Sequence, residues 1–343
     1  MKIYDVIIIG AGPAGLFCAD NLQGSGLSVL LLEKNPGFGD KVCAGGITRK
    51  DIGILGIPEK LFEHQITDTR LQSVWNHSAS NSGRAFVFTV NRKELAEWQR
   101  SRINDKNIEI MLNSRVTKVS NKSLTVNDKN EYGFRFLVGA DGYSSIVRRY
   151  LGIPIKARLI GLQYQIPING GRPRFEIHLH SGYFHSWYGW IFPHRETLAV
   201  GCVADPRYVS SGRLKRKFHR WLHKMHLDIS NATYESQPIG CDYRGWQFGN
   251  IFLAGEAAGF ASWLTGEGIY QCLVSGKAVA EKILDNEHES SELQEVLRYN
   301  EIQRKITKAL ILAGPLRLLL HELLILMMKS SFIKRKVNGS FTE

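Results

Sequence analysis

The stretch Tyr4–Lys34, YDVIIIGAGPAGLFCADNLQGSGLSVLLLEK, decides the fold of this chain. It predicts a buried strand at Tyr4–Ile9, a helix that ends near Gln23, and a second apolar strand at Ser28–Leu32. Glycines mark the turn before the second strand, and the acid Glu33 follows that strand. Two buried strands joined by a helix are the opening of an α/β domain, and we expect that fold class here.

The turn after the first strand carries a GxGxxG motif. Its glycines permit a tight turn, the close approach of a pyrophosphate, and close packing of helix on strand. The helix N-terminus adds free N–H groups and positive potential, and Glu33 stands where an acid would meet a ribose hydroxyl. The stretch therefore predicts a Rossmann-like dinucleotide site. Its candidate binding residues are Gly10, Gly12, Ala14, Gly15, Glu33 and Lys34.

Composition limits the remaining classes of function. The chain has 343 residues, enough for two domains, and a net charge of +12, which favours anionic partners. No zinc-finger, RRM or helix–turn–helix pattern is present, so we expect no nucleic-acid partner. The five cysteines are scattered without CxxC spacing, which argues against disulfides and a metal site and for a reducing compartment. The N-terminus has no secretory signal pattern, and we expect a cytoplasmic protein.

Two later segments distinguish FAD from NAD. Phe134–Arg149 reads as a strand that ends in a Gly-Ala-Asp-Gly turn, and Gly249–Leu284 as a strand, a Gly-Glu turn, a glycine loop and a helix. A nicotinamide half-site needs neither, whereas a flavin bound across a sheet uses an acid at the ribityl chain and a glycine-rich helix start at the ring. The candidates here are Asp141, Gly142, Gly255, Glu256, Gly266, Gly268 and Ile269.

Together these three segments resemble the FAD-binding fold of the glutathione-reductase and para-hydroxybenzoate hydroxylase type. Val90–Gln99, VNRKELAEWQ, resembles the arginine-bearing helix start of that fold, which implies that Arg92 lies near the cofactor. The resemblance also places Val116 against the adenine. Glu256 departs from the usual Gly-Asp pair; it keeps the charge and adds one methylene, so ribityl binding is expected in a shifted position.

Two further elements resemble the geranylgeranyl reductase family, in a short, bacterial-type form. Lys41–Thr48, KVCAGGIT, resembles its Cys-x-Gly-Gly element, and Tyr188–Pro193, YGWIFP, resembles its YxWxFP motif. Either element alone is typical of ordinary core packing, but the two together on a flavin fold favour the family. Ala44 and Trp263 depart from the family pattern, where Gly or Glu and Pro are usual.

The resemblance assigns roles to these residues. Cys43 is expected to be catalytic, either as a proton source or as a group that shapes the site. Lys41 and Ala44 are expected near the cofactor. An apolar wall for a hydrocarbon is expected from the substrate-binding candidates Tyr188, Trp190, Phe192 and Trp263.

The implied reaction is reduction of isolated C=C bonds in a polyprenyl, geranylgeranyl-type lipid or an isoprenoid quinone, with a hydride from flavin N5. Only one dinucleotide fingerprint is present, so NAD(P)H and ferredoxin both remain as electron donors, and a donor protein is a possible partner. Two alternatives stay open. One is a flavin monooxygenase or halogenase that uses a C4a-peroxyflavin. The other is a non-catalytic flavoprotein, because Glu256 and Trp263 depart from the pattern.

Two basic, apolar segments suggest contact with a membrane. Ser211–Leu227 predicts a basic amphipathic helix, for which a membrane contact and packing on its own domain are equally supported. Leu316–Met328 is too short to span a bilayer, which takes about 20 residues. It predicts a helix that closes a lipid pocket or rests on the membrane, followed by Lys334–Lys336. We expect peripheral association with the inner face of the membrane.

The expected domain organisation is discontinuous. The FAD-binding domain is expected to comprise residues 1–64, 90–155 and 245–284. A substrate-binding domain built on an antiparallel sheet is inserted at 65–89 and 156–244, and a helical segment follows at 285–343.

Overall fold

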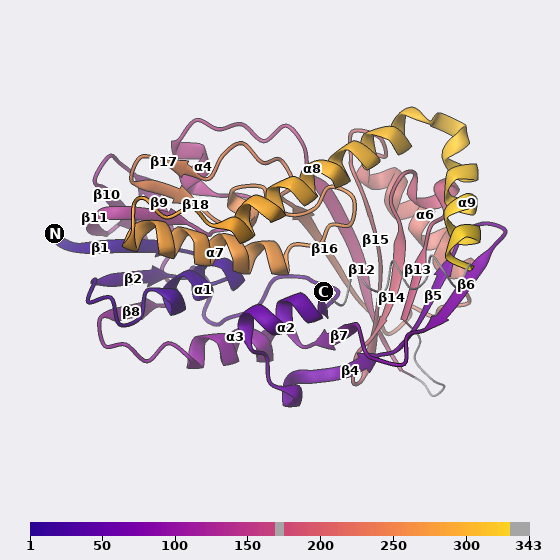
Figure 1. Ribbon diagram of the computed structural model, residues 1–343, viewed down its shortest axis with the longest axis horizontal. Helices are drawn as coiled ribbons and strands as arrows, with labels where there is room; N and C mark the ends of the chain where they lie inside the picture. The colour runs from indigo at the N-terminus through magenta and orange to yellow at the C-terminus, as the bar shows by residue number, and fades with distance from the viewer. Residues whose placement is uncertain (169–174, 330–343) are drawn as a thin grey trace. The chain divides into compact units, whose positions relative to one another are not determined.

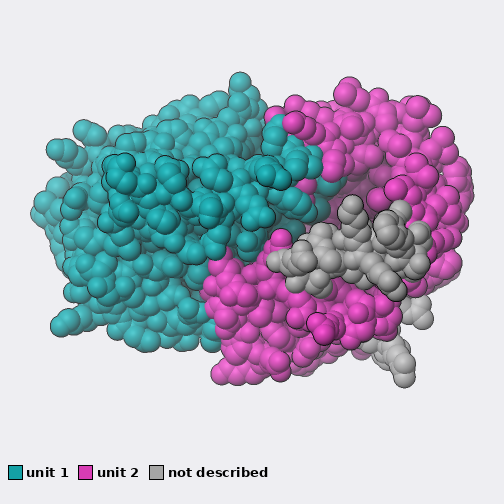
Figure 2. Space-filling model, viewed as in Figure 1, with its two compact units in different colours: residues 1–40, 93–158, 239–302 teal, residues 41–92, 159–238, 303–343 magenta. Residues whose placement is uncertain are grey.

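The computed structural model describes residues 1–168 and 175–329, which form two compact units (Figure 2). Unit 1 comprises residues 1–40, 93–158 and 239–302, and unit 2 the described part of 41–92, 159–238 and 303–343.

The core of unit 1 is a largely parallel sheet. Its strands lie in the order β17 (Gln247–Phe248), β18 (Ile251–Leu253), β11 (Asn130–Gly139), β1 (Lys2–Ile9), β2 (Val29–Leu32), β8 (Ile108–Met111). All neighbours from β18 to β8 are parallel, whereas β17 is antiparallel to β18. Two more strands extend β11 as an antiparallel ladder: β10 (Ser123–Val126) and β9 (Val116–Val119).

The strands of this sheet are buried on both faces. Val6, Ile7 and Ile8 of β1 are fully buried, as is every residue of β2. Such near-continuous apolar runs are typical of parallel strands that helices cover on both faces. The expected α/β class of the cofactor domain is therefore confirmed.

The helices of unit 1 are α1 (Pro13–Asn21), α3 (Arg92–Ser101, whose first residue belongs to unit 2), α4 (Ile146–Tyr150), the 3-10 turn η2 (Gly255–Ala257), α7 (Ile269–Leu284) and the first half of α8 (Ser291–Leu312). Helices α1 and α7 lie side by side (Figure 1). A Cβ on Gly276 of α7 would lie 2.3 Å from the carbonyl oxygen of Ala14, so the two helices approach as closely as their backbones allow.

Unit 2 is built on a mainly antiparallel sheet, and one of the pairs in its described residues is parallel. The strand order is β16 (Thr233–Ile239), β12 (Leu159–Pro167), β15 (Thr197–Ala204), β14 (Gly189–Pro193), β13 (Phe175–His178), β5 (Asp68–Gln72), β6 (His77–Asn81). The parallel pair is β13 with β5. A smaller sheet has the order β3 (Gly46–Thr48), β7 (Val87–Val90), β4 (Phe62–Ile66). The helical elements are α2 (Arg49–Leu55), η1 (Glu59–Leu61), α5 (Ser181–Phe184), α6 (Ser211–Lys224), η3 (Gly314–Leu316) and α9 (Arg317–Lys329).

The compact units divide the chain at other residues than the expected domains do, at several places. Residues 285–343 were expected as a separate segment, whereas 285–302 group with unit 1 and 303–329 with unit 2. Residues 41–64 were expected with the cofactor domain but group with unit 2. The cause is strand pairing, because β3 and β4 both pair with β7, for example Ile47 with Phe88 and Ile66 with Val87.

Helix α6 is the basic amphipathic helix of the sequence, and its apolar face packs within unit 2. Leu214, Phe218, Trp221 and Leu222 are buried. The Trp221 ring stacks on Phe218 and meets the ring of Phe184 edge-on. Of the two interpretations of this helix, packing on its own domain is therefore the one the structure supports.

The C-terminal region is helical, as expected, through α8 and α9. Lys334–Lys336 lie outside the described residues. Within residues 1–168 and 175–329, no single helix has the length and apolarity needed to cross a membrane. The pair formed by Ser291–Leu312 and Gly314–Lys329 meets the criteria only when both parts are combined across a bend of 116°.

The contact between α1 and α7 generates a prediction. Gly276→Ala should lower the free energy of unfolding by about 1–3 kcal/mol, because the added methyl group has no room beside Ala14. Gly53→Ala is the matched control. Gly53 is exposed in the middle of α2 with nothing within 4 Å of its Cβ position, so this change should stabilise by about 0.5–1 kcal/mol. Thermal and urea unfolding of both variants measures the difference, and equal effects would contradict the packing argument.

Candidate active site

The first part of the candidate site lies at the carboxyl ends of β1 and β11. Gly10 directly follows β1 and has φ +101°, a value that favours glycine. A Cβ at Gly10 would lie 2.5 Å from the oxygen of Ala140 and 2.8 Å from the Cα of Asp141. A side chain at Gly10 would therefore collide with the residues that follow β11. The absence of that side chain lets Asp141 lie next to the glycine turn.

The N-terminus of α1 is open to a ligand. Gly12 is its N-cap, no side chain caps the helix, and nothing lies within 4 Å of the Cβ position of Gly12. Gly15 is packed tightly, because a Cβ there would lie 1.9 Å from the oxygen of Gly10. Glu33 lies beside the turn, and its two carboxylate oxygens accept from the N–H groups of Ala11 and Asn35, each at 2.9 Å. Free helix N–H groups next to an acid suit a phosphate and an adjoining ribose.

Asp141 has one satisfied and one unsatisfied oxygen. Its Oδ2 accepts from the N–H of Ile146 at the start of α4, at 2.7 Å. Its Oδ1 is buried and has no hydrogen-bond partner in the described part of the chain. Burial raises the pKa of Asp141. A buried acceptor without a donor is costly, so this oxygen fits a hydroxyl of a bound ligand.

Glu256 belongs to η2 and lies near the start of α7. It is 9% exposed, and its Oε2 accepts from the N–H of Gly240 at 3.1 Å. Its Oε1 lies 4.0 Å from the Cβ position of Gly268, the N-cap of α7, which no side chain caps. A Cβ on Gly255 would lie 3.2 Å from the Cβ of Ala14. The Gly-Glu turn, the glycine turn and the start of α7 therefore meet at one edge of the sheet.

The remaining cofactor candidates of unit 1 lie at or near this edge with less distinctive surroundings. Gly142 and Gly266 have φ of +75° and +68°, and Ile269 is the first residue of α7. Val116 is buried at the start of β9, whereas Lys34 is exposed. Trp263 is 9% exposed and lies within a turn in which the N–H of Gly266 donates to the oxygen of Ser262.

Unit 2 contributes two cationic candidates. Lys41 is exposed, and the other is Arg92. Its Nε and Nη1 are buried without a hydrogen-bond partner among the described residues. Burial raises the pKa of nearby Asp51, and the positive charge of Arg92 acts in the opposite direction. The Asp51 carboxylate accepts from the N–H and the hydroxyl of Thr48, so it caps α2 and does not pair with Arg92 through that oxygen. The guanidinium thus has unused donors for an anionic or polar ligand.

These observations fit FAD. Two helices begin at glycines that carry no side-chain cap, and an unsatisfied acceptor and an unsatisfied donor occur in the predicted set. A ligand with a pyrophosphate and polyhydroxyl chain satisfies such groups.

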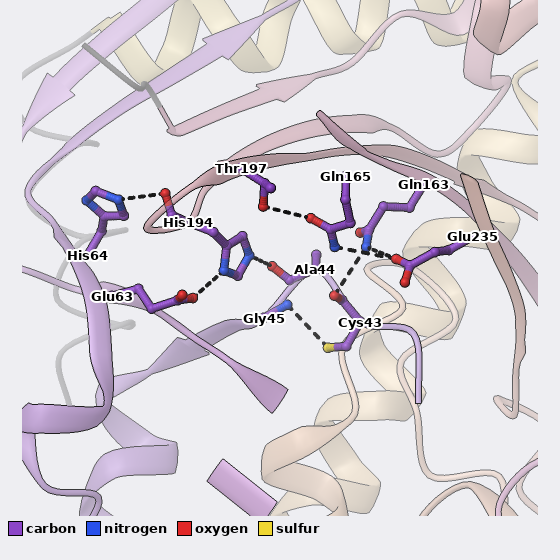
Figure 3. Close-up of polar contacts among 10 residues, drawn as sticks. All are labelled: Cys43, Ala44, Gly45, Glu63, His64, Gln163, Gln165, His194, Thr197 and Glu235. Carbon is purple, nitrogen blue, oxygen red and sulfur yellow. Dashed lines mark hydrogen bonds and ion pairs between the residues drawn. The ribbon is translucent and has the colours of Figure 1, made fainter. Parts of the chain in front are cut away.

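Cys43 lies in a loop of unit 2 whose backbone is held by side chains (Figure 3). Its half-buried thiol accepts from the N–H of Gly45 at 3.4 Å. Its carbonyl oxygen accepts from Nε2 of Gln163 at 3.3 Å, and the same nitrogen donates to Glu235 at 3.0 Å. The oxygen of Gln163 in turn accepts from the indole N–H of Trp190 at 3.3 Å. A polar chain therefore joins the Cys43 backbone to the aromatic strand β14.

The two glycines after Cys43 pack against the end of β14. Gly45 has φ +72°, and a Cβ there would lie 2.5 Å from Cε1 of His194. A Cβ on Gly46 would lie 2.9 Å from the ring of Phe192. The two segments that resemble one family are thus in direct contact, and the glycines are there because His194 and Phe192 take the space of their side chains.

His194 is held between two acceptors. Its Nε2 lies 2.9 Å from the oxygen of Ala44, and its Nδ1 contacts the carboxylate of Glu63 (Figure 3). A carbonyl and a carboxylate both accept hydrogen bonds, so the arrangement suits a ring that donates from both nitrogens. Burial raises the pKa of Glu63, but the hydrogen bond and charge of His194 outweigh burial, and the net pKa lies below its ordinary value. An ion pair therefore fixes the carbonyl next to Cys43.

His194, Glu63 and Gln163 were missed in the sequence. His194 directly follows YGWIFP, so its position next to a recognised motif was the one available signal. Glu63 and Gln163 carry no local pattern, since their roles depend on strand pairing.

The rings of Tyr188, which directly precedes β14, and of Trp190 and Phe192 within β14 form a row. Ring centroids lie 5.9 Å apart between Tyr188 and Trp190 and 6.4 Å apart between Trp190 and Phe192. Trp190 is 8% exposed, and Phe192 stacks on Phe175 at 4.2 Å. Tyr188 and Phe192 keep partial exposure. Among the described residues, no group of three or more His, Cys, Asp or Glu could hold a metal ion.

Comparison with known proteins agrees with this geometry. The family model described as an FAD binding domain matches residues 3–225. An uncharacterised protein of Methanosarcina barkeri is 29% identical over 325 residues, which cover 91% of this chain and 82% of that protein. The geranylgeranyl diphosphate reductase of Rhodobacter capsulatus is 27% identical, with 81% and 74% covered. The menaquinone reductase of Mycolicibacterium smegmatis is 26% identical, with 81% and 75% covered.

Solved structures show the same fold. A geranylgeranyl bacteriochlorophyll reductase-like protein from Thermoplasma acidophilum has a TM-score of 0.79 at 17% identity, with 96% of this chain and 92% of that chain covered. A flavin-dependent brominase has a TM-score of 0.70 at 17% identity, with 99% and 93% covered. The chain belongs to the FAD binding domain family and is an FAD-dependent oxidoreductase with geranylgeranyl reductases among its relatives.

Proposed function

We propose that this protein reduces isolated C=C bonds in a polyprenyl lipid or the side chain of an isoprenoid quinone. The observation that carries the proposal is the contact between the Cys43 loop and the aromatic strand, through Gly45 with His194 and Gly46 with Phe192. The names of two relatives, a geranylgeranyl diphosphate reductase and a menaquinone reductase, support this substrate class.

The chemistry divides between cofactor and protein. Reduced FAD, when bound, supplies a hydride to one alkene carbon and becomes oxidised. The other carbon takes a proton, so the π bond is replaced by two C–H bonds. An isolated alkene develops no oxyanion for the protein to stabilise. Positioning and exclusion of water therefore remain as the main contributions of the chain.

We assign these contributions as follows. Gly10, Gly12 and Gly15 and the start of α1 hold the pyrophosphate; Glu33 meets the ribose; Asp141 and Glu256 meet hydroxyls. Arg92 supplies its unused donors. Tyr188, Trp190 and Phe192 form the hydrocarbon wall, and Trp263 shapes the pocket.

Cys43 is the proposed proton source. Its thiol makes one long contact to the N–H of Gly45, and the loop around it is fixed by Gln163 and His194. A fixed backbone with a loosely bound thiol suits a group that must reach a substrate carbon. The electron donor is NAD(P)H or a protein such as ferredoxin. We further propose that the enzyme works as a peripheral protein on the membrane that contains its substrate.

The first test is anaerobic reoxidation of the bound flavin. The purified protein is reduced, and a geranylgeranyl lipid or menaquinone is added without oxygen. We expect the oxidised flavin spectrum to return with the prenyl lipid, and mass spectrometry to find a product two mass units heavier per bond reduced, about 2 Da. Flavin that stays reduced with every prenyl lipid but reoxidises quickly in air would contradict the proposal and indicate oxygen chemistry.

A second test concerns Cys43. Cys43→Ser should retain bound FAD while its turnover falls by about a hundredfold or more, because the weaker acid delivers the proton less readily. Cys241→Ser, which changes another partly buried thiol, is the control and should leave turnover unchanged. Full turnover by Cys43→Ser with FAD bound would exclude the proposed role.

A third test uses the ion pair behind Ala44. Glu63→Gln keeps the size of the side chain, which is 7% exposed, and removes its charge. At pH 7 the variant should be less stable by about 1–3 kcal/mol, since a hydrogen bond between charged groups is lost. The pKa of Glu63 is lowered in the folded state, so its contribution is complete above its ordinary value of 4.5 and disappears as the pH falls through the folded value.

Thermal unfolding between pH 7 and pH 3 measures this difference. The two proteins should converge at the acid end. Glu59→Gln, at an exposed position of the same unit, is the control and should match the wild type throughout. A deficit that persists unchanged at the acid end would show that the pair is not ionised.

A further inference from the structure

Helix α9 buries two polar and two apolar side chains against the protein and exposes a largely apolar side to solvent. Its inner face consists of His321, Glu322, Ile325 and Met328, all buried. Its outer face is formed by exposed Leu and Met side chains: Leu319, Leu320, Leu323, Leu324, Leu326 and Met327. Exposed Leu316 of η3 directly precedes them. Amphipathic helices on soluble proteins show the opposite arrangement, with leucines inward.

Buried polar contacts hold α9 in this orientation. The Glu322 carboxylate accepts from the Ser73 hydroxyl, the N–H groups of Val74 and Trp75, and the Asn76 amide, at 2.6–3.1 Å. These residues form the turn of the β5–β6 hairpin, along which α9 lies (Figure 1). Burial raises the pKa of Glu322, but these hydrogen bonds outweigh burial and lower it overall, so the carboxylate is ionised.

Further contacts fix both ends of the helix. At its N-terminus, Arg317 contacts His185 and Ser186. Near its C-terminus, the Ser78 hydroxyl donates to the oxygen of Met328 at 3.2 Å. The outer leucines are therefore held in place and do not result from a loosely attached tail.

The hairpin turn that holds Glu322 also carries an exposed aromatic side chain. Trp75 is 64% exposed, although its backbone N–H donates a hydrogen bond to Glu322. The same contact that orients α9 thus also presents Trp75. Tryptophan next to leucines is typical of the boundary between lipid headgroups and acyl chains.

The charges near this surface favour one occupant. From Gln303 to Lys329, the only acidic residue is the buried Glu322. The exposed charged residues of the same segment are all basic: Arg304, Lys305, Lys308 and Lys329. Two copies of this chain would bring like charges together, whereas an anionic bilayer would attract them.

We propose that the outer face of α9 and Trp75 form a surface that docks on an anionic lipid bilayer. This surface would bring the enzyme to a substrate in the membrane. That role of the surface rests on the proposed function. Short helices that lie in the interface plane bind by this combination of apolar area and basic charge.

Liposome flotation tests the proposal. The holoprotein should float with vesicles of phosphatidylglycerol and phosphatidylcholine at low salt and much less with phosphatidylcholine alone. Leu319→Gln/Leu320→Gln/Leu323→Gln should lower the partition coefficient by more than about tenfold, because three side chains that enter the acyl region become polar. The matched control is Ile3→Gln/Ile155→Gln, which changes exposed apolar residues elsewhere and should float as the wild type does.

A second measurement uses Trp75 directly. Brominated lipids should quench part of the tryptophan fluorescence of the wild type, and Trp75→Phe should remove that part. This result does not depend on the folding of the triple variant, whose far-UV circular dichroism and bound FAD are checked separately.

Three results would overturn the proposal. The first is wild-type protein that does not float with anionic vesicles, and the second is a well-folded triple variant that floats as well as the wild type. The third is a concentration-dependent dimer that the triple variant dissociates, which would show that a second copy covers the face. Turnover of a prenyl lipid in detergent micelles tests the proposed function separately, because the triple variant should keep that activity whether or not it binds vesicles.

Discussion

Close approaches that only glycine permits are the constraint on which the candidate residues of each unit depend. In unit 1, Gly10 lets β1 end against Ala140, and Gly276 lets α7 lie on the backbone of α1. These approaches bring the glycine turn, Asp141 and Glu256 to one edge of the parallel sheet, where ligands of such folds bind. In unit 2, Gly45 and Gly46 let the Cys43 loop meet β14. In each unit, neighbouring atoms occupy the space that a side chain at the glycine would need.

Much of the fold could be predicted because its strongest signals are local. The apolar run of β1 and the glycines behind it specify a strand and a helix start over a few residues, and the structure confirms both. Domain limits were harder to predict. Residues 41–64 follow the first βαβ unit in the chain, but they pair with β7, and pairing between distant strands leaves no local pattern. The orientation of α6 was equally ambiguous, because a basic amphipathic helix looks the same whether protein or lipid covers its apolar face.

The candidate site was predictable to the extent that its residues lie in motifs. The glycines, Glu33, Asp141 and Cys43 were recognised from motifs, although their roles toward FAD and substrate stay proposals. The residues that hold the Cys43 loop were not found, because Glu63 and Gln163 act through geometry that only the folded chain provides. Charge did not decide which surface of the protein packs and which stays exposed. Net basicity suggested a membrane, but the helix that carries much of it, α6, uses its apolar side for packing.

The packing of Gly45 on His194 and of Gly46 on Phe192 has a consequence for how this protein can change. The two residues of each pair lie about 150 residues apart in the chain, as do Ala44 and His194. The side chain at the end of β14 nevertheless occupies the space beside the glycine. A side chain gained at either glycine requires a smaller residue at the end of β14, and a larger residue there is tolerated only while the glycines remain. The Cys43 loop and strand β14 are therefore expected to evolve together. Among related chains, substitutions in the two segments should occur together or not at all.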